Sequence, residues 1–267
     1  MTTWTQQWEF FAVSSRTGVA EFRTNTTWRR WLFGWLVRLI AQSIFFTSLG
    51  LSLGSKAAVD YLAIGNSVVL VCMEVVAVIP FMLNERRTGA ISLHLVAPTS
   101  SILAYLSRNI YCPIMGIFSS TFGLFVIAEV FRIPINETFV FVPLLIALIG
   151  LSVYAYAFTV AAIAFNLPSL GMAALNFSYL SIMTFCGVDA PVGYWPKAVR
   201  VISDIFPVTH GLVAVRDLLG GMPAGTISWN CLLEAIVGTG WLGLGSAIFY
   251  FSRYLAYRRG NIEVSAL

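Results

Sequence analysis

The apolar positions of the chain gather into long runs that short polar segments separate. A helix needs about 20 mostly apolar residues to cross a bilayer, because roughly 30 Å of hydrocarbon is spanned at about 1.5 Å per residue. The first half of the chain holds three such runs, at residues 31–53, 61–83 and 109–128. Arg38 lies close enough to the start of the first run to reach the headgroups, and Glu74 is the single charge in the second. Each run predicts one transmembrane helix.

The second half of the chain predicts three more spans. Residues 138–188 carry no charge but are too many for one helix, and Asn166-Leu167-Pro168 divides them into two runs joined by a tight turn. These runs cover about 139–165 and 168–186, and a sixth covers about 231–251. Because the chain shows no internal repeat and no low-complexity linker, the sequence predicts a single all-α membrane domain of six spans.

The segment before the first span, residues 1–30, is too polar to insert but predicts an amphipathic helix. Its large apolar side chains share one helical face, and two arginines lie at the edge of that face. A helix of this kind lies along the cytoplasmic surface of a membrane, although a soluble helix packed on another subunit is the alternative. The apolar residues are Trp4, Trp8, Phe11, Val19 and Phe22, and the arginines are Arg16 and Arg23.

The turn between the second and third spans, residues 84–107, predicts a short helix of its own. Ile91 and Leu95 are four residues apart and share a helical face between charged flanks, and Pro98 ends the helix. An apolar ridge of this kind is able to dock a cytoplasmic partner, although an ordinary loop helix gives the same pattern.

The segment between the fifth and sixth spans, residues 187–221, predicts a hairpin that enters the outer leaflet and returns. Two short amphipathic helices meet at Pro207, and the side chains of Tyr194 and Trp195 suit the level of the headgroups. This external hairpin is marked by Pro191, Trp195, Pro207 and His210, and we expect His210 to form a hydrogen bond there and not to catalyse a reaction.

Composition agrees with a membrane protein and excludes several other classes. Hydrophobic residues make up 58% of the 267 positions and charged residues 10%, against roughly a quarter charged in a soluble domain. The net charge is +4, but no basic run with interleaved aromatics indicates a nucleic-acid partner. Four cysteines without a CxxC pair, and only two histidines, argue against a metal site. Cys186 and Cys231 could form a disulfide, although lone cysteines in apolar helices usually pack as small hydrophobic residues.

The basic residues predict the orientation of the chain. Eleven of the 16 lysines and arginines fall before or near the start of the first run, in the turn between the second and third runs, and after the last run. Six spans place these segments on one side of the membrane, which the positive-inside rule makes cytoplasmic. We therefore expect a multi-pass protein of the cell's inner (plasma) membrane, with one domain over residues 1–267 and both termini in the cytoplasm.

Two motifs and the layout of the spans carry a family resemblance. The chain resembles the membrane subunit of ABC-2 type exporters, the group that includes daunorubicin-resistance and nodulation-factor permeases. The segment Glu85…Gly89-x-Ile91…Leu95-x-Ala97-Pro98 is similar to the coupling helix of that family. The segment Gly187…Pro191…Trp195-Pro196…Pro207-x-Thr209-His210…Arg216-Asp217 is similar to its re-entrant hairpin. Ser92 stands where the family often has an acid, and the first span lacks the pattern of the polysaccharide-exporting branch.

The resemblance implies a transport subunit that carries no ATPase of its own. The permease would work as a dimer with an identical or a related chain. Two separate ATPase subunits, which bind ATP and Mg, would drive this dimer. Its cargo would be an amphipathic small molecule, a lipid or a glycolipid that leaves the cytoplasm or the inner leaflet. The nearest phosphate loop, Gly50 to Lys56, has the wrong spacing for a nucleotide site. The residues implied to couple to the ATPase are Glu85, Arg86, Arg87, Gly89, Ile91, Leu95 and Pro98.

Several residues within the spans are candidates for the transport path or for a subunit seam. A charge such as Glu74 costs roughly 2.5–3.5 kcal/mol inside a bilayer, so its side chain needs a polar environment. In the functional interpretation, Glu74 lines a cavity where it meets a polar or cationic substrate or relays protons. In the structural interpretation, it forms a hydrogen bond to Asn176 or a serine of a neighbouring helix. Asn176, Phe177 and Phe185 are candidate path residues, although aromatics in membrane helices usually face lipid or packing partners. The small-residue face of Gly171, Ala174, Ser178 and Ser181 suits a dimer seam or internal packing.

Two other functions compete with the exporter. An ion-gradient carrier usually shows sequence repeats or broken helices at matching positions, which this chain lacks apart from the turn at Pro168 and the hairpin. An intramembrane enzyme needs several polar groups at one depth, and the predicted spans offer one glutamate in their interior, Glu74, since Glu234 lies at the outer end of the sixth.

Overall fold

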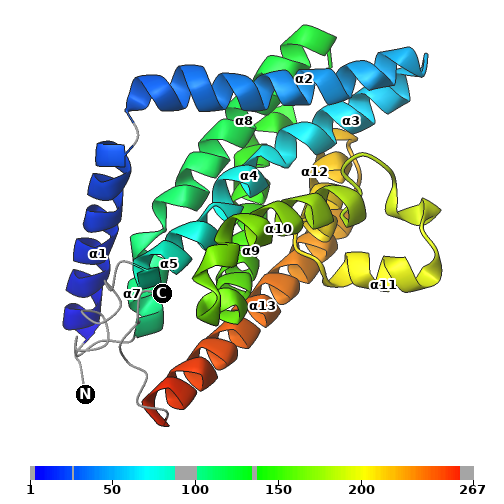
Figure 1. Ribbon diagram of the computed structural model, residues 1–267. Coiled ribbons are helices and arrows are strands. Elements are labelled where there is room, and N and C mark those ends of the chain that lie inside the picture. The colour runs from blue at the N-terminus through cyan, green and yellow to red at the C-terminus, as the bar shows by residue number, and fades with distance from the viewer. Residues whose placement is uncertain (1–3, 26, 88–100, 134–136, 259–267) are drawn as a thin grey trace.

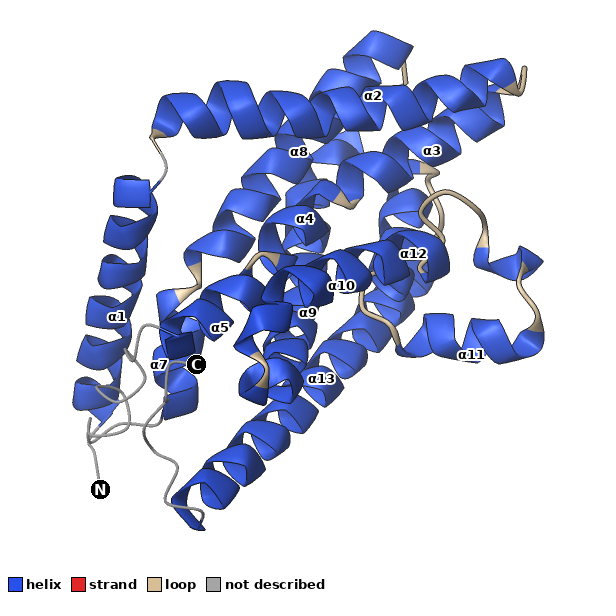
Figure 2. Ribbon diagram, in the orientation of Figure 1, coloured by secondary structure: helices blue, strands red, loops and turns tan. Residues whose placement is uncertain are grey.

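The structure, a computed structural model, describes residues 4–25, 27–87, 101–133 and 137–258. All regular elements within these ranges are helical, and no strand occurs among them (Figure 2). The all-α fold predicted from the apolar runs is therefore confirmed.

The helices follow the predicted runs with shifts of a few residues, and the last helix is longer than its run. In chain order the elements are α1 (Trp4–Asn25), the π-helix η1 (Arg30–Leu36), α2 (Val37–Ser52), α3 (Lys56–Val68), α4 (Leu70–Val76), α5 (Val78–Arg87), α7 (Ser101–Arg108), α8 (Tyr111–Phe131), the 3-10 helix η2 (Glu137–Phe141), α9 (Val142–Ile163), the 3-10 helices η3 (Ala164–Asn166) and η4 (Pro168–Leu170), α10 (Gly171–Phe185), the 3-10 helix η5 (Val192–Tyr194), α11 (Lys197–Ile205), α12 (Thr209–Leu219) and α13 (Ala224–Arg258).

Five helical stretches of the described chain are long and apolar enough to cross a membrane. A sixth candidate is the pair α11 and α12, which is bent by 87° and forms the hairpin predicted for residues 187–221. The expected fifth span, 168–186, is shorter than the others, because its helix α10 has 15 residues and measures about 22 Å. The five stretches are Arg30–Ser52, Lys56–Glu85, Ile102–Phe131, Glu137–Ile163 and Ala224–Ser252.

The ends of the helices fall into two groups (Figure 1). The start of α1, the end of α5, α7 and the end of α13 lie at the lower left of the view, whereas the α2–α3 turn, the end of α8, α12 and the start of α13 lie at the upper right. Most of the segments predicted to share the cytoplasmic side therefore lie at one end of the molecule, whereas the first span begins above α1 at the upper left of the view.

The second span and α9 form the core of the molecule. The second span is the most buried of the five, and α9 contacts α4, α5, α8, α12 and α13. α13 packs closely on α9 because glycines face small side chains there. A Cβ at Gly245 would lie 2.6 Å from Thr159 Oγ1, and one at Gly238 would lie 3.0 Å from Ser152 Oγ. Thr159 Oγ1 also donates to the carbonyl of Trp241 over 2.6 Å, which joins the two helices by a hydrogen bond.

The helix predicted before the first span is present as α1, and it packs through small residues together with part of its predicted apolar face. Ser14 and Gly18 are buried, and a Cβ at Gly18 would collide with the Arg108 carbonyl of α7. Of the predicted apolar face, Phe22 is half-buried with its ring centroid 5.3 Å from that of Tyr111, whereas Trp8 is 72% exposed. Small residues therefore dock α1 on α7, while Phe22 packs beside them and Trp8 stays exposed.

All four cysteines are free, so the disulfide considered between Cys186 and Cys231 is wrong. Cys186 is buried, and its thiol donates to the carbonyl of Pro207 over 3.2 Å at the bend of the hairpin. Its environment is that of a packed polar residue and not of a cross-link.

Candidate functional site

Glu74 accepts three hydrogen bonds on one oxygen of its carboxylate. The indole N–H groups of Trp31 and Trp35 donate to Oε1 over 3.2 and 2.9 Å, and Ser119 Oγ of α8 donates over 3.1 Å. Hydrogen bonds to a charged acceptor are stronger than neutral ones and offset part of the cost of placing a carboxylate in a membrane. A serine was among the expected partners, but Asn176 was not found near Glu74, and the two indoles were not foreseen.

The two indoles come from the π-helix η1, and its widened turn brings them to one acceptor. The N–H of Val37 bonds the carbonyl of Leu32, a separation of five residues that is typical of a π-helix. Trp31 is 3% exposed, whereas Trp35 is half-buried and has the guanidinium carbon of Arg38 5.1 Å from its ring centroid. π-helical turns are rare and frequently occur at functional sites, so the space beside Glu74 is a candidate site.

A cavity of about 220 Å³ opens beside Glu74. It lies between η1, the end of α4, the start of α5, and α8, and Phe22 of α1 closes one side. Through Trp31 and Trp35, Glu74 contacts the first turns of the first span. The lining residues are Phe22, Arg30, Trp31, Trp35, Glu74, Ala77, Phe81, Tyr111, Cys112 and Met115.

An ion pair braces the two ends of the segment that resembles a coupling helix. Glu85, near the end of α5, is 6% exposed, and its Oε1 lies 3.0 Å from Nε of Arg108 at the end of α7. The resemblance implies a coupling role for Glu85, and the side chain holds α5 against α7 inside the chain.

The other residues implied to couple to the ATPase follow Glu85 in the sequence. Arg86 and Arg87 end α5, and Gly89, Ile91, Leu95 and Pro98 lie outside the described residues.

The hairpin is pinned to α13 by Glu234, which is fully buried. Its Oε1 accepts the N–H of Val208 and its Oε2 accepts the N–H of Gly211, both over 2.9 Å. These amides lie at the first turn of α12, where helical N–H groups lack partners within the helix and a negative charge is stabilised. Val208 has a φ of 88°, so the bend between α11 and α12 is strained and Glu234 holds it in place.

A second contact holds the hairpin to α3. The guanidinium of Arg216 stacks on the ring of Tyr61 with its carbon 3.5 Å from the centroid, and it donates to the carbonyls of Tyr61 and Gly187 over 3.2 and 2.9 Å. Beside it, Asp189 accepts a hydrogen bond from Asn66 over 3.0 Å. Partial desolvation raises the pKa of Asp189, against the opposing effects of the Asn66 hydrogen bond and the Arg216 charge.

The residues predicted to mark the hairpin are brought together around its bend. Pro207 is buried at the bend, and the ring of His210 contacts the backbone carbonyl of Asp204 over 3.2 Å, joining α12 to α11. Pro191 is exposed, whereas Trp195 is half-buried and its carbonyl accepts a hydrogen bond from Arg200 over 2.8 Å. His210 thus forms a contact within the hairpin, as expected.

The residues singled out on α10 fall on two different faces. Gly171, Ser178 and Ser181 are buried and Ala174 is half-buried; Gly171 lies against Pro80, and Ser178 accepts a hydrogen bond from Tyr156 over 3.3 Å. This face packs within the chain, which was the alternative to a dimer seam. Asn176 and Phe177 are exposed on the other side, and the half-buried Phe185 has its ring centroid 6.1 Å from that of Phe206. The three path candidates therefore do not line the cavity at Glu74.

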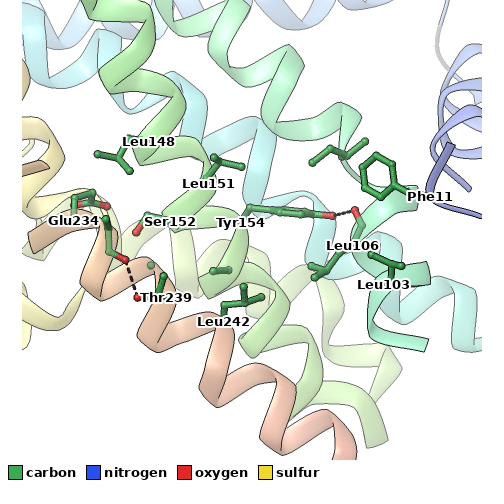
Figure 3. Close-up of a pocket in the computed structure, with 14 residues that line it drawn as sticks. Phe11, Leu103, Leu106, Leu148, Leu151, Ser152, Tyr154, Glu234, Thr239 and Leu242 are labelled. Carbon is green, nitrogen blue, oxygen red and sulfur yellow. Dashed lines mark hydrogen bonds between the residues drawn. The ribbon is translucent and has the colours of Figure 1, made fainter. Parts of the chain in front are cut away.

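A larger apolar groove of about 440 Å³ runs along α9 between α7 and α13 (Figure 3). The side chain of Tyr154 crosses the groove, and its hydroxyl donates to the carbonyl of Leu106 over 2.6 Å. Phe11 of α1 and Glu234 lie at opposite ends of the view in Figure 3, and five leucines line the wall between them. No sequence pattern indicated this groove, because its wall is assembled from four separate helices.

The family model of the ABC-2 type transporter matches residues 19–219 of the chain. The chain belongs to the ABC-2 type transporter family. No curated protein and no solved structure matches it.

Membership makes this ABC-2 chain a multi-pass membrane protein and the permease subunit of an ABC transporter. It also implies association with an ABC ATPase subunit, and a permease of this family is a transport subunit that is not itself catalytic. The match covers α2 to α12, including the segment 84–107 and the hairpin, so the two elements that carried the resemblance both lie inside the family domain.

Several residues that build the site of this ABC-2 permease were not predicted. Glu234 and Asn66 carried no motif, and their roles depend on contacts with residues 23 or more positions away. Trp31 and Trp35 were assigned to an apolar run. They are four residues apart on one face of the first span, and the second span carries Glu74. Pairing these two spans could have indicated that the tryptophans contact the glutamate.

Proposed function

We propose that this permease is the transmembrane half of an ATP-driven exporter. Two copies, or this chain and a related permease, form the path, and two separate ATPase subunits bind ATP and Mg and supply the energy. The cargo is an amphipathic small molecule, a lipid or a glycolipid, which leaves the cytoplasm or the inner leaflet by alternating access. Both termini and the segment 84–107 are on the cytoplasmic side of the cell's inner membrane, which agrees with the arginines near those ends.

The observation that carries this proposal is the braced base of the segment 84–107. The ion pair between Glu85 and Arg108 ties the end of α5 to the end of α7, and these helices continue into the second and third spans. A push on the segment is therefore transmitted to both spans at once, and one of these spans carries Glu74.

The exposed face of α10 supports a second permease copy. Met172, Phe177 and Leu180 are each more than 60% exposed, and Asn176 lies on the same side. A polar amide beside large apolar side chains suits an interface between helices better than a face turned to lipid.

The proposal is tested by purifying the permease with its P-loop ATPase and measuring ATP hydrolysis in lipid. We expect the two chains to co-purify and hydrolysis to depend on the permease. Leu95→Asp should abolish the dependence by removing the apolar ridge, and Glu85→Ala should weaken it by releasing the brace. If neither substitution changed coupling, or if transport survived ATP depletion and collapsed with the proton gradient, the proposal would be wrong.

A further inference from the structure

The cavity beside Glu74 combines a carboxylate with one free oxygen and an arginine that does not neutralise it. All three hydrogen bonds to Glu74 fall on Oε1, and no hydrogen bond of the described residues uses Oε2. Arg30 lines the same cavity, but no ion pair within the described ranges joins it to Glu74. The three donors around Oε1 offset part of the cost of an ionised carboxylate, and Glu74 lines the cavity with Oε2 outside these hydrogen bonds.

We propose that this cavity binds the headgroup of a zwitterionic amphiphile, with an ammonium group on Oε2 of Glu74 and an anionic group on Arg30. The proposal rests on the proposed function, because it names the class of cargo that enters the permease. The chemistry is that of an aminophospholipid such as phosphatidylethanolamine.

The shape of the cavity favours an amphiphile over a ligand that is enclosed completely. A pocket that takes up a drug-sized molecule usually measures 300–1,000 Å³, whereas this cavity measures about 220 Å³ and has room for a headgroup alone. Phe22, Phe81 and Met115 form apolar walls beside the charged groups. The acyl chains of the ligand would therefore remain in the bilayer while the headgroup enters.

The position of the cavity agrees with entry from the leaflet next to α1. Arg30 begins the first span, and Trp35 is five residues further, about 7 Å along the helix. Arg30 thus lies at the start of the first span, and the two indoles that contact Glu74 lie within the first two turns of that span. Phe22 lines the cavity from α1, whose exposed Trp8 suits contact with the membrane surface.

The charges of Glu74 and Arg30 together favour a zwitterionic ligand over an anionic lipid or a simple amine. An anionic lipid such as phosphatidylglycerol would be held by Arg30 but repelled by Glu74. An amphiphilic amine without an anionic group, such as dodecylamine, would be held by Glu74 but would leave Arg30 unpaired. A zwitterion satisfies both residues and adds no net charge to the cavity.

The test measures lipid binding to the permease alone in nanodiscs by native mass spectrometry, in equal amounts of phosphatidylethanolamine and phosphatidylglycerol. We expect phosphatidylethanolamine to be retained preferentially. Glu74→Gln should weaken this retention at least about tenfold, because a charge-assisted hydrogen bond is lost, and Arg30→Gln should weaken it as well. Glu129→Gln removes a charge from the exposed surface of α8 and serves as the matched control, which should leave retention unchanged.

A second variant guards against a folding defect. Trp35→Phe removes one donor to Oε1 but keeps the carboxylate, so phosphatidylethanolamine should still be preferred over phosphatidylglycerol. Equal retention of the two lipids by the unmodified chain, or unchanged retention in Glu74→Gln, would overturn the proposal. Binding of dodecylamine as strong as that of phosphatidylethanolamine, with no effect of Arg30→Gln, would overturn it in favour of a simple amine site.

Because the measurement needs no ATPase, its failure is distinct from a failure of the proposed function. A permease that stimulates its ATPase but shows no lipid preference would contradict this inference alone. A permease that prefers phosphatidylethanolamine but couples to no ATPase would contradict the proposed function.

Discussion

Removal of the Glu234 carboxylate should release the hairpin from α13. In the folded chain this carboxylate accepts the N–H groups of Val208 and Gly211, each over 2.9 Å, in a fully buried position. Glu234→Ala leaves both amides without a partner at the start of α12 and also leaves a void in α13. The positive φ of Val208 adds strain that the carboxylate no longer restrains.

The size of the effect follows from the two orphaned amides. A buried donor left without its acceptor costs about 1–3 kcal/mol, so two of them cost at least about 2 kcal/mol. A cost of that size, applied to local opening of the hairpin, makes amide exchange about 30-fold faster. Glu234→Gln keeps the shape and one acceptor but sets an NH2 group against an N–H donor, so it should give a smaller increase in the same direction.

The assay is hydrogen exchange followed by mass spectrometry of the peptide that covers residues 206–214, with the permease in nanodiscs. Glu129→Gln removes a charge from the exposed surface of α8 and is the control. Unchanged protection in Glu234→Ala would show that the carboxylate does not hold the hairpin. Faster exchange over the whole chain would also contradict the reasoning, because the effect should be confined to the hairpin and its contacts.

Three further predictions concern other contacts of the fold. Gly245→Leu should destabilise the chain by about 1–3 kcal/mol because it forces α13 away from Thr159, whereas Gly243→Leu on the same helix meets open space; thermal unfolding in detergent should separate the two variants. Arg216→Lys should also lower the unfolding temperature, because an ammonium group cannot replace both the stacking on Tyr61 and the forked hydrogen bonds, and an unchanged temperature would refute that role. Phe177→Cys should react with a bifunctional thiol reagent to give covalent dimers in membranes, whereas Ser178→Cys on the buried face should not, and equal yields would argue against a seam at α10.

The sequence was sufficient to predict the helices and their breaks. Runs of about 20 apolar residues dictate spans, and the Asn166-Leu167-Pro168 turn and the bend at Pro207 both occur where proline and its neighbours disfavour a continuous helix. Length was less well predicted, because α13 extends beyond its apolar run at both ends. Polar residues such as Asn230 continue the helix there, since hydrogen bonding along the backbone does not require an apolar side chain.

The pairing of side chains between helices could not be read from the sequence. The small-residue face of α10 was compatible with a seam or with internal packing, and only the position of Gly171 against Pro80 of α5 decides between them. The resemblance implied a coupling role for Glu85, but nothing in the sequence indicated that its side chain is buried against Arg108. Periodicity identifies which residues share a face, whereas the partner of that face depends on how the helices are arranged.

The central claim, that residues 84–107 couple this permease to a separate ATPase, is tested most directly by photo-cross-linking. A photoreactive residue at Leu95 should form a covalent adduct with a P-loop ATPase in membranes, and the yield should change when ATP is added. The same probe at Leu53, which is exposed at the opposite end of the molecule, should give no such adduct. Adducts with the ATPase from Leu53 but none from Leu95 would contradict the account.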